Sequence, residues 1–302
     1  MELWLGALAL GLAYSCLGMG VYITMRIFNF PDITADGSLT LGASITAALL
    51  VAGAQPYVAV CAALVGGFLA GATTGIIHTR FRVNGLLSGI LVMTALYSVN
   101  LRTMGRSNVP LLETVTVLTP LDQLPGIASR QAGPILLFLV TTLAFVLILS
   151  WFFRTDFGLA MRATGDNETM IAAQGVSTDS MKIIGIGLSN ALIALSGSLV
   201  AQFQGFADIG MGVGIVVFGL ASVIIGDTLS TLVSRQFRIW IKFTSVVIGT
   251  VLFRFLVAFA LSLGLDPVDL KIATAVFVLL AIVLPRLRSF LRPSPGLASR
   301  IT

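Results

Sequence analysis

The sequence predicts an all-α membrane protein that crosses the bilayer about nine times, and its apolar runs are also compatible with eight or ten crossings. Three observations lead to this class. Of 302 residues, 57% are hydrophobic and only 10% are charged, and the mean hydropathy is +1.01. The apolar residues fall in long runs, and the Lys and Arg residues lie mostly at the ends of these runs. A soluble domain would not tolerate this composition, so residues 1–302 are expected to form a single transmembrane domain.

The apolar runs define the expected spans. Most are long enough to cross a hydrocarbon core about 30 Å thick as a helix. They cover residues 3–25, 39–53, 57–77, 85–101, 133–153, 182–203, 213–225, 243–263 and 272–284. The first run has Glu2 before it and Arg26 after it, which is the reverse of a signal peptide, so we expect a retained span.

The distribution of positive charge predicts the orientation. In this layout thirteen of the eighteen Lys and Arg residues lie on one side, four lie on the other, and Arg254 lies within the eighth span. Short cytoplasmic loops carry the excess of positive charge. We therefore expect an external N terminus, and a cytoplasmic C terminus and segment 154–182. The cations form no patch for nucleic acid, so membrane lipids are the expected surroundings.

Residues 154–182 form the one long polar interruption in the second half of the chain. Asp166 or Asn167 can cap a helix with Glu168 in its first turn, and Gly175 can end it. The helix would be about two turns long. It would present a small, mostly apolar face formed by Met170, Ile171 and Gln174. An ordinary interhelical loop is the alternative.

Two short segments predict broken helices. Phe30–Ile33 reads FPDI after the first span, and Phe206–Ile209 reads FADI after the sixth. Pro31 and Gly37 argue against a continuous helix in the first segment. In the layout above the two segments lie on opposite sides of the membrane, as in an inverted repeat whose broken helices line a transport pathway. The broken helices would cover Asn29–Leu41 and Asp208–Gly219, and Asp32, Asp36, Ser38 and Asp208 would face water. A chance match of a few residues is the alternative.

Polar groups inside the apolar runs and at their breaks are candidates for that pathway, because such groups are costly in a bilayer. An acidic residue near the inner end of the seventh span, Asp227, is a candidate partner for the cation within the eighth span, and a purely structural ion pair is the alternative. Three glycines at GxxxG spacing, Gly67, Gly71 and Gly75, would allow close helix packing within or between subunits. The pathway candidates are Asn29, Asp32, Asp36, Ser38, Asn100, Asn190, Gln202, Asp208 and Arg254.

Motifs for catalysis are absent from the sequence. No Gly-Lys pair occurs, so the chain has no Walker A loop for nucleotide. The single histidine, His78, has no neighbouring ligands at metal-binding spacing, and no Ser/His/Asp or Cys/His set is apparent. We expect neither an enzyme nor a cofactor or metal site in this chain.

Three stretches carry a family resemblance: MRATGDNETMIAAQGVSTDSMK, NFPDITADGSLTLGAS and VVFGLASVIIGD. The chain resembles membrane permease subunits of bacterial ABC importers in the branched-chain amino acid and ribose permease family, and it is most similar to the tryptophan/tyrosine-type branch. The resemblance implies that Arg162 to Gly175 is the coupling helix, which docks on the ATPase. It divides the chain into a first helical half (1–153), a coupling segment (154–182) and a second half with a basic tail (183–302).

The resemblance also implies the partners and the location. It implies a homodimeric permease in the bacterial inner membrane, two cytoplasmic ATPase subunits that hold ATP and Mg²⁺, and an external substrate-binding protein. The expected cargo is a small polar solute, an amino acid and in this branch an aromatic one. An ABC permease for a sugar or nucleoside is one alternative. An ion-coupled secondary transporter is another, although such proteins usually carry more intramembrane carboxylates.

Overall fold

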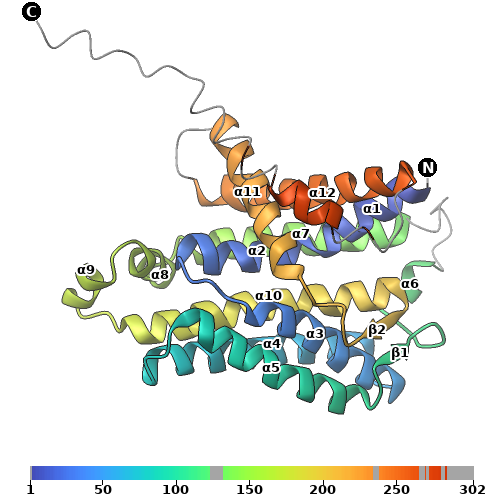
Figure 1. Cartoon of the computed structure of the whole chain (residues 1–302), viewed down its shortest axis with the longest axis horizontal. Helices are drawn as coiled ribbons and strands as arrows, with labels where there is room; N and C mark the ends of the chain where they lie inside the picture. Colours follow the sequence, from blue (N-terminus) through green and yellow to red (C-terminus); the bar gives the residue numbers. More distant parts are fainter. Residues whose placement is uncertain are drawn as a thin grey trace, which may run out of the picture.

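The computed structural model describes residues 2–122, 132–233, 238–264, 269, 272–279 and 283. These residues form a stack of long, nearly antiparallel helices (Figure 1). The first half contains α1 (Glu2–Ala13), α2 (Ser15–Tyr22), the π-helix η1 (Ile23–Ile27), α3 (Thr34–Val51), α4 (Pro56–Arg80), α5 (Gly85–Met104), β1 (Asn108–Pro110), α6 (Thr119–Asp122) and α7 (Ala132–Phe152). The second half contains α8 (Asp156–Asp166), α9 (Glu168–Ala173), α10 (Thr178–Gln204), β2 (Phe206–Asp208), α11 (Ile215–Val233) and α12 (Ile239–Ser262).

The helices confirm the predicted class of polytopic all-α membrane protein. Within the described residues, seven helical stretches are long and apolar enough to cross a membrane, and Ile215–Thr231 is a shorter apolar helix. Each of the first eight predicted spans overlaps one of these eight helices. The ninth is helical over residues 272–279, and part of the remainder lies outside the described residues.

The first break is shorter than predicted. The first span ends in η1, where the amide of Phe28 donates to the carbonyl of Ile23, and residues 28–33 are then non-helical. Pro31 lies in this break, but α3 begins at Thr34 and therefore includes Gly37. The expectation that Gly37 interrupts the helix is wrong, because a single glycine in a helix packed on both sides is tolerated.

Helix α10 is the centre of the fold. It lies between the layer of α1, α2 and α7 and the layer of α3, α4 and α5 (Figure 1). The three predicted packing glycines of α4 face it. A Cβ atom at Gly67 would lie 2.4 Å from the carbonyl oxygen of Asn190, and one at Gly71 would lie 2.4 Å from that of Ile186. The glycine face therefore serves packing within the subunit, where small residues let two backbones approach.

The two ends of the helix stack differ. The N terminus and the segment with β1, β2 and α6 lie at one end, and α8 and α9 lie at the opposite end (Figure 1). Strands β1 and β2 pair antiparallel, with Asn108 opposite Asp208. The polar loop after α5 thus contains both an extended piece and a short helix. This separation matches the relative sidedness predicted from charge, and the absolute orientation stays a prediction.

Candidate functional site

The second break meets the first turn of α3. Between β2 and α11, residues 209–214 are non-helical turns. The carboxylate of Asp36 accepts hydrogen bonds from the amides of Gly214 and Val216, each at 2.9 Å, so it satisfies two free amides at the start of α11. A Cβ atom at Gly212 would lie 2.0 Å from the carbonyl oxygen of Asp36. Irregular backbone at membrane depth is tolerated where it is buried in protein or lines a cavity.

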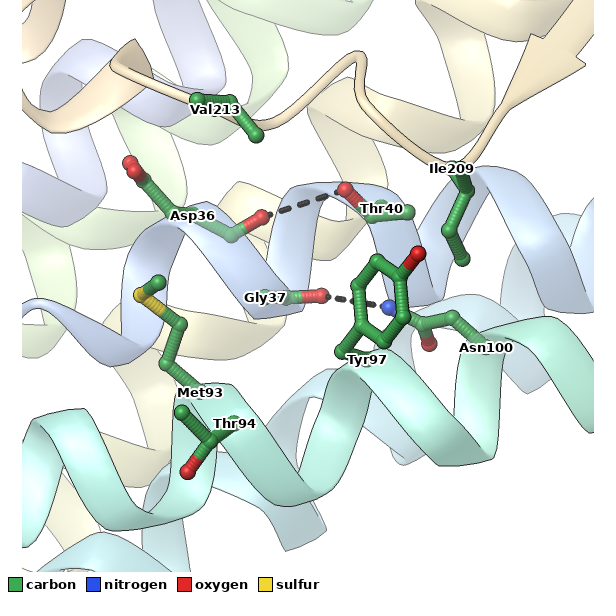
Figure 2. A pocket seen from close by; sticks show the side chains of 9 residues that line it. All are labelled: Asp36, Gly37, Thr40, Met93, Thr94, Tyr97, Asn100, Ile209 and Val213. Carbon is green, nitrogen blue, oxygen red and sulfur yellow. Dashed lines mark hydrogen bonds between the residues drawn. The ribbon is translucent and has the colours of Figure 1, made fainter. Parts of the chain in front are cut away.

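A cavity of about 360 Å³ lies between α3, α5 and this turn (Figure 2). Its walls are mostly apolar or aromatic. On one side of the cavity Asn100 links α5 to α3, because its Nδ2 donates to the carbonyl oxygen of Gly37 at 3.2 Å. The Oδ1 atom of Asn100 is buried and has no hydrogen-bond partner among the described residues. The lining residues are Asp36, Gly37, Thr40, Met93, Thr94, Tyr97, Asn100, Ile209 and Val213.

Three other pathway candidates form a separate buried cluster. Asn190 donates from Nδ2 to Oδ2 of Asp32 and accepts at Oδ1 from the hydroxyl of Ser38, both at 2.7 Å. The second carboxylate oxygen of Asp32 accepts from the amide of Thr34. Asp32, Ser38 and Asn190 are at most 2% exposed. The prediction that Asp32 and Ser38 face water is wrong for this structure, because the cluster ties the first break to α10.

The remaining pathway candidates lie elsewhere. Gln202 accepts from the amide of Val117 at 2.9 Å and thereby holds the polar loop after α5 against α10. Asp208 accepts from the amide of Gly210 at 2.8 Å in the turn after β2. Asn29 lies at the opposite end, in the first break. The structure therefore divides the predicted pathway residues among separate places.

Arg254 does not pair with Asp227, contrary to the sequence-based suggestion. Its guanidinium carbon lies 5.3 Å from the centre of the Tyr14 ring, a cation–π contact. Asp227 instead binds Lys242 at 3.0 Å and also pairs with Arg26. These pairs join the end of the first span to α11 and α12.

The polar segment between α7 and α10 forms the predicted short helix, α9. The Oδ1 atom of Asn167 accepts from the amide of Met170 at 3.0 Å, and Gly175 after the helix has φ +86°. Both end signals are therefore confirmed. Glu168 accepts a 2.7 Å hydrogen bond from Lys182, and this bond and the charge of Lys182 hold the pKa of Glu168 below its ordinary value.

The exposed face of α9 differs from the predicted one. Ile171 is only 7% exposed and packs within the chain, whereas Met170 is 60% exposed and Gln174 is also exposed. The expectation that Ile171 faces a partner is wrong in this structure. Helix α9 packs against α10 and against α8, an additional helix of 11 residues that carries the partly buried Arg162.

The C-terminal end of α8 sits directly on the first break. A Cβ atom at Gly165 would lie only 1.6 Å from the carbonyl oxygen of Ile27. Nδ2 of Asn29 donates to the carbonyl oxygen of Gly165 at 3.3 Å, and Asn29 has φ +50°. The polar segment is thus in contact with the end of the first span, seven residues before the start of α3.

Replacing Gly165 with valine should separate these two elements. Because the opposing atom is backbone, it has no rotamer that could make room, so α8 must shift away from Ile27. We expect disulfide cross-linking between cysteines placed at Asn29 and Asp166 to fall severalfold relative to the parent protein. The unfolding temperature of the permease should change much less than the cross-linking yield. Ala172→Val, at an exposed helical position of α9, is the control for the added bulk. Equal cross-linking in the Gly165 variant and the parent would contradict the contact.

Met93 and Tyr97 are among the lining residues of the cavity that sequence reasoning missed. With Asn100 they recur at positions i, i+4 and i+7 on α5, a spacing that places them on one helix face. The signal was therefore present in the sequence. It did not stand out, because a Met and a Tyr on a membrane helix are equally typical of packing or of lipid contact.

Comparisons with known proteins agree with this fold. Residues 3–284 match the family described as branched-chain amino acid transport system / permease component. The tyrosine transport system permease protein of Clostridioides difficile (strain R20291) is 43% identical over 268 residues, covering 89% of this chain and 86% of the relative. The ribose import permease protein RbsC of Escherichia coli (strain K12) is 26% identical over 268 residues, with coverages of 88% and 80%.

A solved structure has the same fold. It is PsaBC from Streptococcus pneumoniae in complex with Fab, and its matching chain has a TM-score of 0.51 and 14% sequence identity. The match covers 92% of this chain and 89% of the solved chain. At this level of identity the likeness concerns the fold alone.

Proposed function

Because the chain belongs to the branched-chain amino acid transport family of ABC permeases, we propose that it carries an aromatic amino acid into the cytoplasm of a bacterium. An external substrate-binding protein delivers the amino acid, and two cytoplasmic ATPase subunits drive the transfer with ATP and Mg²⁺. The aromatic substrate class is supported by the 43% identical relative, which is named as a tyrosine transport permease.

The observation that carries the ATP-driven mechanism is the arrangement of α8 and α9. They form a compact polar segment at one end of the helix stack (Figure 1), with an exposed apolar side chain, Met170, and with Gly165 in contact with the first break. A partner that binds Met170 and moves this segment would pull on the end of the first span. An ordinary interhelical loop needs neither the capped helix nor the close contact.

The proposed coupling surface uses the segment from Arg162 to Gly175. Met170 and Gln174 form its docking face, and Asn167 and Glu168 fix the start of α9. Ile171 is buried within the chain and therefore packs α9 against the rest of the permease, outside the docking face.

The proposed assembly contains two copies of this chain in the bacterial inner membrane. Its N terminus is external, and its C terminus and α9 are cytoplasmic. One face of α5 exposes large apolar side chains, which lipid or the second copy would cover. Mass measurement of the purified complex tests the copy number, and a second, different permease in the particle would contradict the homodimer.

Uptake by the reconstituted transporter tests the proposed function. Proteoliposomes that contain the permease and its ATPase, with the external binding protein added, should accumulate labelled L-tyrosine only when ATP is present. Labelled D-ribose is the comparison, since a ribose permease is a more distant relative at 26% identity. Uptake of D-ribose in place of the amino acid would favour the sugar alternative, and uptake driven by an ion gradient without ATP would favour a secondary transporter.

A further inference from the structure

We infer that the cavity between α3, α5 and residues 209–213 receives the side chain of the transported amino acid. Within it, Asn100 selects aromatic rings that carry a hydrogen-bond donor, which means a phenol or an indole. The inference rests on the proposed function and extends it, because it makes the permease itself a selective element beside the external binding protein.

The buried oxygen of Asn100 is the first support. Its amide nitrogen faces the carbonyl of Gly37, which can only accept a hydrogen bond, so the side-chain oxygen is turned away from Gly37. Asn100 is 1% exposed, and its Oδ1 has no partner among the described residues. Native proteins rarely leave a buried acceptor unpaired, since this costs free energy. A ligand that donates a hydrogen bond would satisfy it.

The size and the walls of the cavity indicate the kind of donor. The volume of about 360 Å³ is near the lower end of the roughly 300–1,000 Å³ of ligand pockets. Met93, Ile209 and Val213 supply apolar surface, and Tyr97 supplies an aromatic ring (Figure 2). An ammonium group would lose its hydration against such walls, whereas a neutral phenol or indole N–H loses much less. The side chain of the amino acid therefore fits the cavity better than its α-ammonium group.

The carboxylate of Asp36 does not change this assignment. Both of its oxygens already accept hydrogen bonds from amides at the start of α11. Figure 2 shows these oxygens on the side away from Tyr97 and Asn100. Asp36 therefore serves to hold the 209–214 turn that closes one wall, and Asn100 carries the selectivity.

Tyr97 controls access to the oxygen of Asn100. It lies one turn earlier on α5 and beside Asn100 in the cavity (Figure 2). Tyr97 is 56% exposed, and exposed side chains change rotamer within nanoseconds. When Tyr97 rotates, the ring of a substrate can take its place and donate to Oδ1 of Asn100. A phenyl ring would fill the same space and leave the oxygen unpaired, so it should bind about tenfold more weakly.

Protection of a single cysteine tests the inference. Thr94→Cys lines the cavity and is exposed, and the exposed Cys61 is first replaced by alanine, while the buried Cys16 is kept. The full-length permease in lipid nanodiscs is labelled with a small thiol reagent, with and without L-tyrosine, L-tryptophan, L-phenylalanine or D-ribose. Ser107→Cys, in the exposed loop before β1, is the matched control.

We expect L-tyrosine and L-tryptophan to slow labelling at position 94 severalfold, at concentrations about tenfold lower than L-phenylalanine requires. None of the ligands should affect position 107. Asn100→Leu, combined with Thr94→Cys, should abolish the preference for tyrosine over phenylalanine. The comparison of ligands on the Thr94→Cys protein does not depend on this second variant being folded.

Four results would overturn the inference. If no aromatic amino acid protects position 94, the cavity is not a binding site. If phenylalanine protects as well as tyrosine, Asn100 does not select. If L-tyrosine is taken up by the reconstituted transporter while position 94 is unprotected, the inference alone fails. Protection by D-ribose in place of aromatic amino acids would contradict the proposed substrate class as well.

Discussion

Replacing Met170 with aspartate should abolish ATP-driven uptake while the permease remains folded and inserted. Met170 is 60% exposed on α9, so the new charge disturbs no buried contact within the chain. In the proposed complex the same side chain is buried against the ATPase, where an apolar anchor contributes about 2 kcal/mol or more. A carboxylate there would also lose its hydration. Uptake should therefore fall by at least about thirtyfold.

Two comparison variants separate this effect from misfolding. Met170→Leu keeps an apolar side chain and should retain most of the uptake. Ile171→Asp places a charge on a residue that is only 7% exposed, so it should lower the unfolding temperature of the permease as well as its uptake. The measurements are uptake, copurification of the ATPase and thermal unfolding. Normal uptake by Met170→Asp would remove α9 from the coupling surface.

Replacing Asn190 with leucine should destabilise the permease strongly. The change leaves Oδ2 of Asp32 and the hydroxyl of Ser38 without the partners that they have at 2.7 Å. Because Asp32 is only 2% exposed, water cannot readily replace the lost amide. Leaving a buried donor or acceptor without a partner costs about 1–3 kcal/mol per group. We expect a marked fall in the unfolding temperature of the purified protein in detergent.

A double replacement sharpens this prediction. Asp32→Leu combined with Asn190→Leu removes the stranded carboxylate, so it should recover part of the lost stability, since removing both partners is less costly than removing one. Asn108→Leu is the control, because its amide donates to Asp208 at 3.2 Å at an exposed position. An unfolding temperature for Asn190→Leu equal to that of the control would contradict the buried cluster.

The sequence predicts the spans well, because each is set by a local property. A helix in a bilayer must satisfy its own backbone hydrogen bonds, so a long apolar run is sufficient to indicate one. The ends of α9 were predictable for a similar reason. Asn167 and Gly175 act through the backbone of their own helix, and their effects do not depend on distant residues.

The orientation of side chains was less predictable, because it depends on contacts far apart in the chain. A helix of six residues such as α9 has no stable face of its own, and its packing against α8 and α10 decides that Ile171 points inward. The burial of Asp32 likewise depends on Asn190, 158 residues later. No local pattern indicates that Tyr14, rather than Asp227, lies beside Arg254.

The central claim, that α9 docks on a cytoplasmic ATPase, is tested most directly by cross-linking. A photoactivatable maleimide is attached to Met170→Cys in the Cys61→Ala protein, and the assembled transporter is illuminated. We predict a product with the combined mass of permease and ATPase, and no such product from Ser107→Cys at the opposite end of the helix stack. An ATPase cross-link from position 107, or none from position 170 in an active complex, would contradict the account.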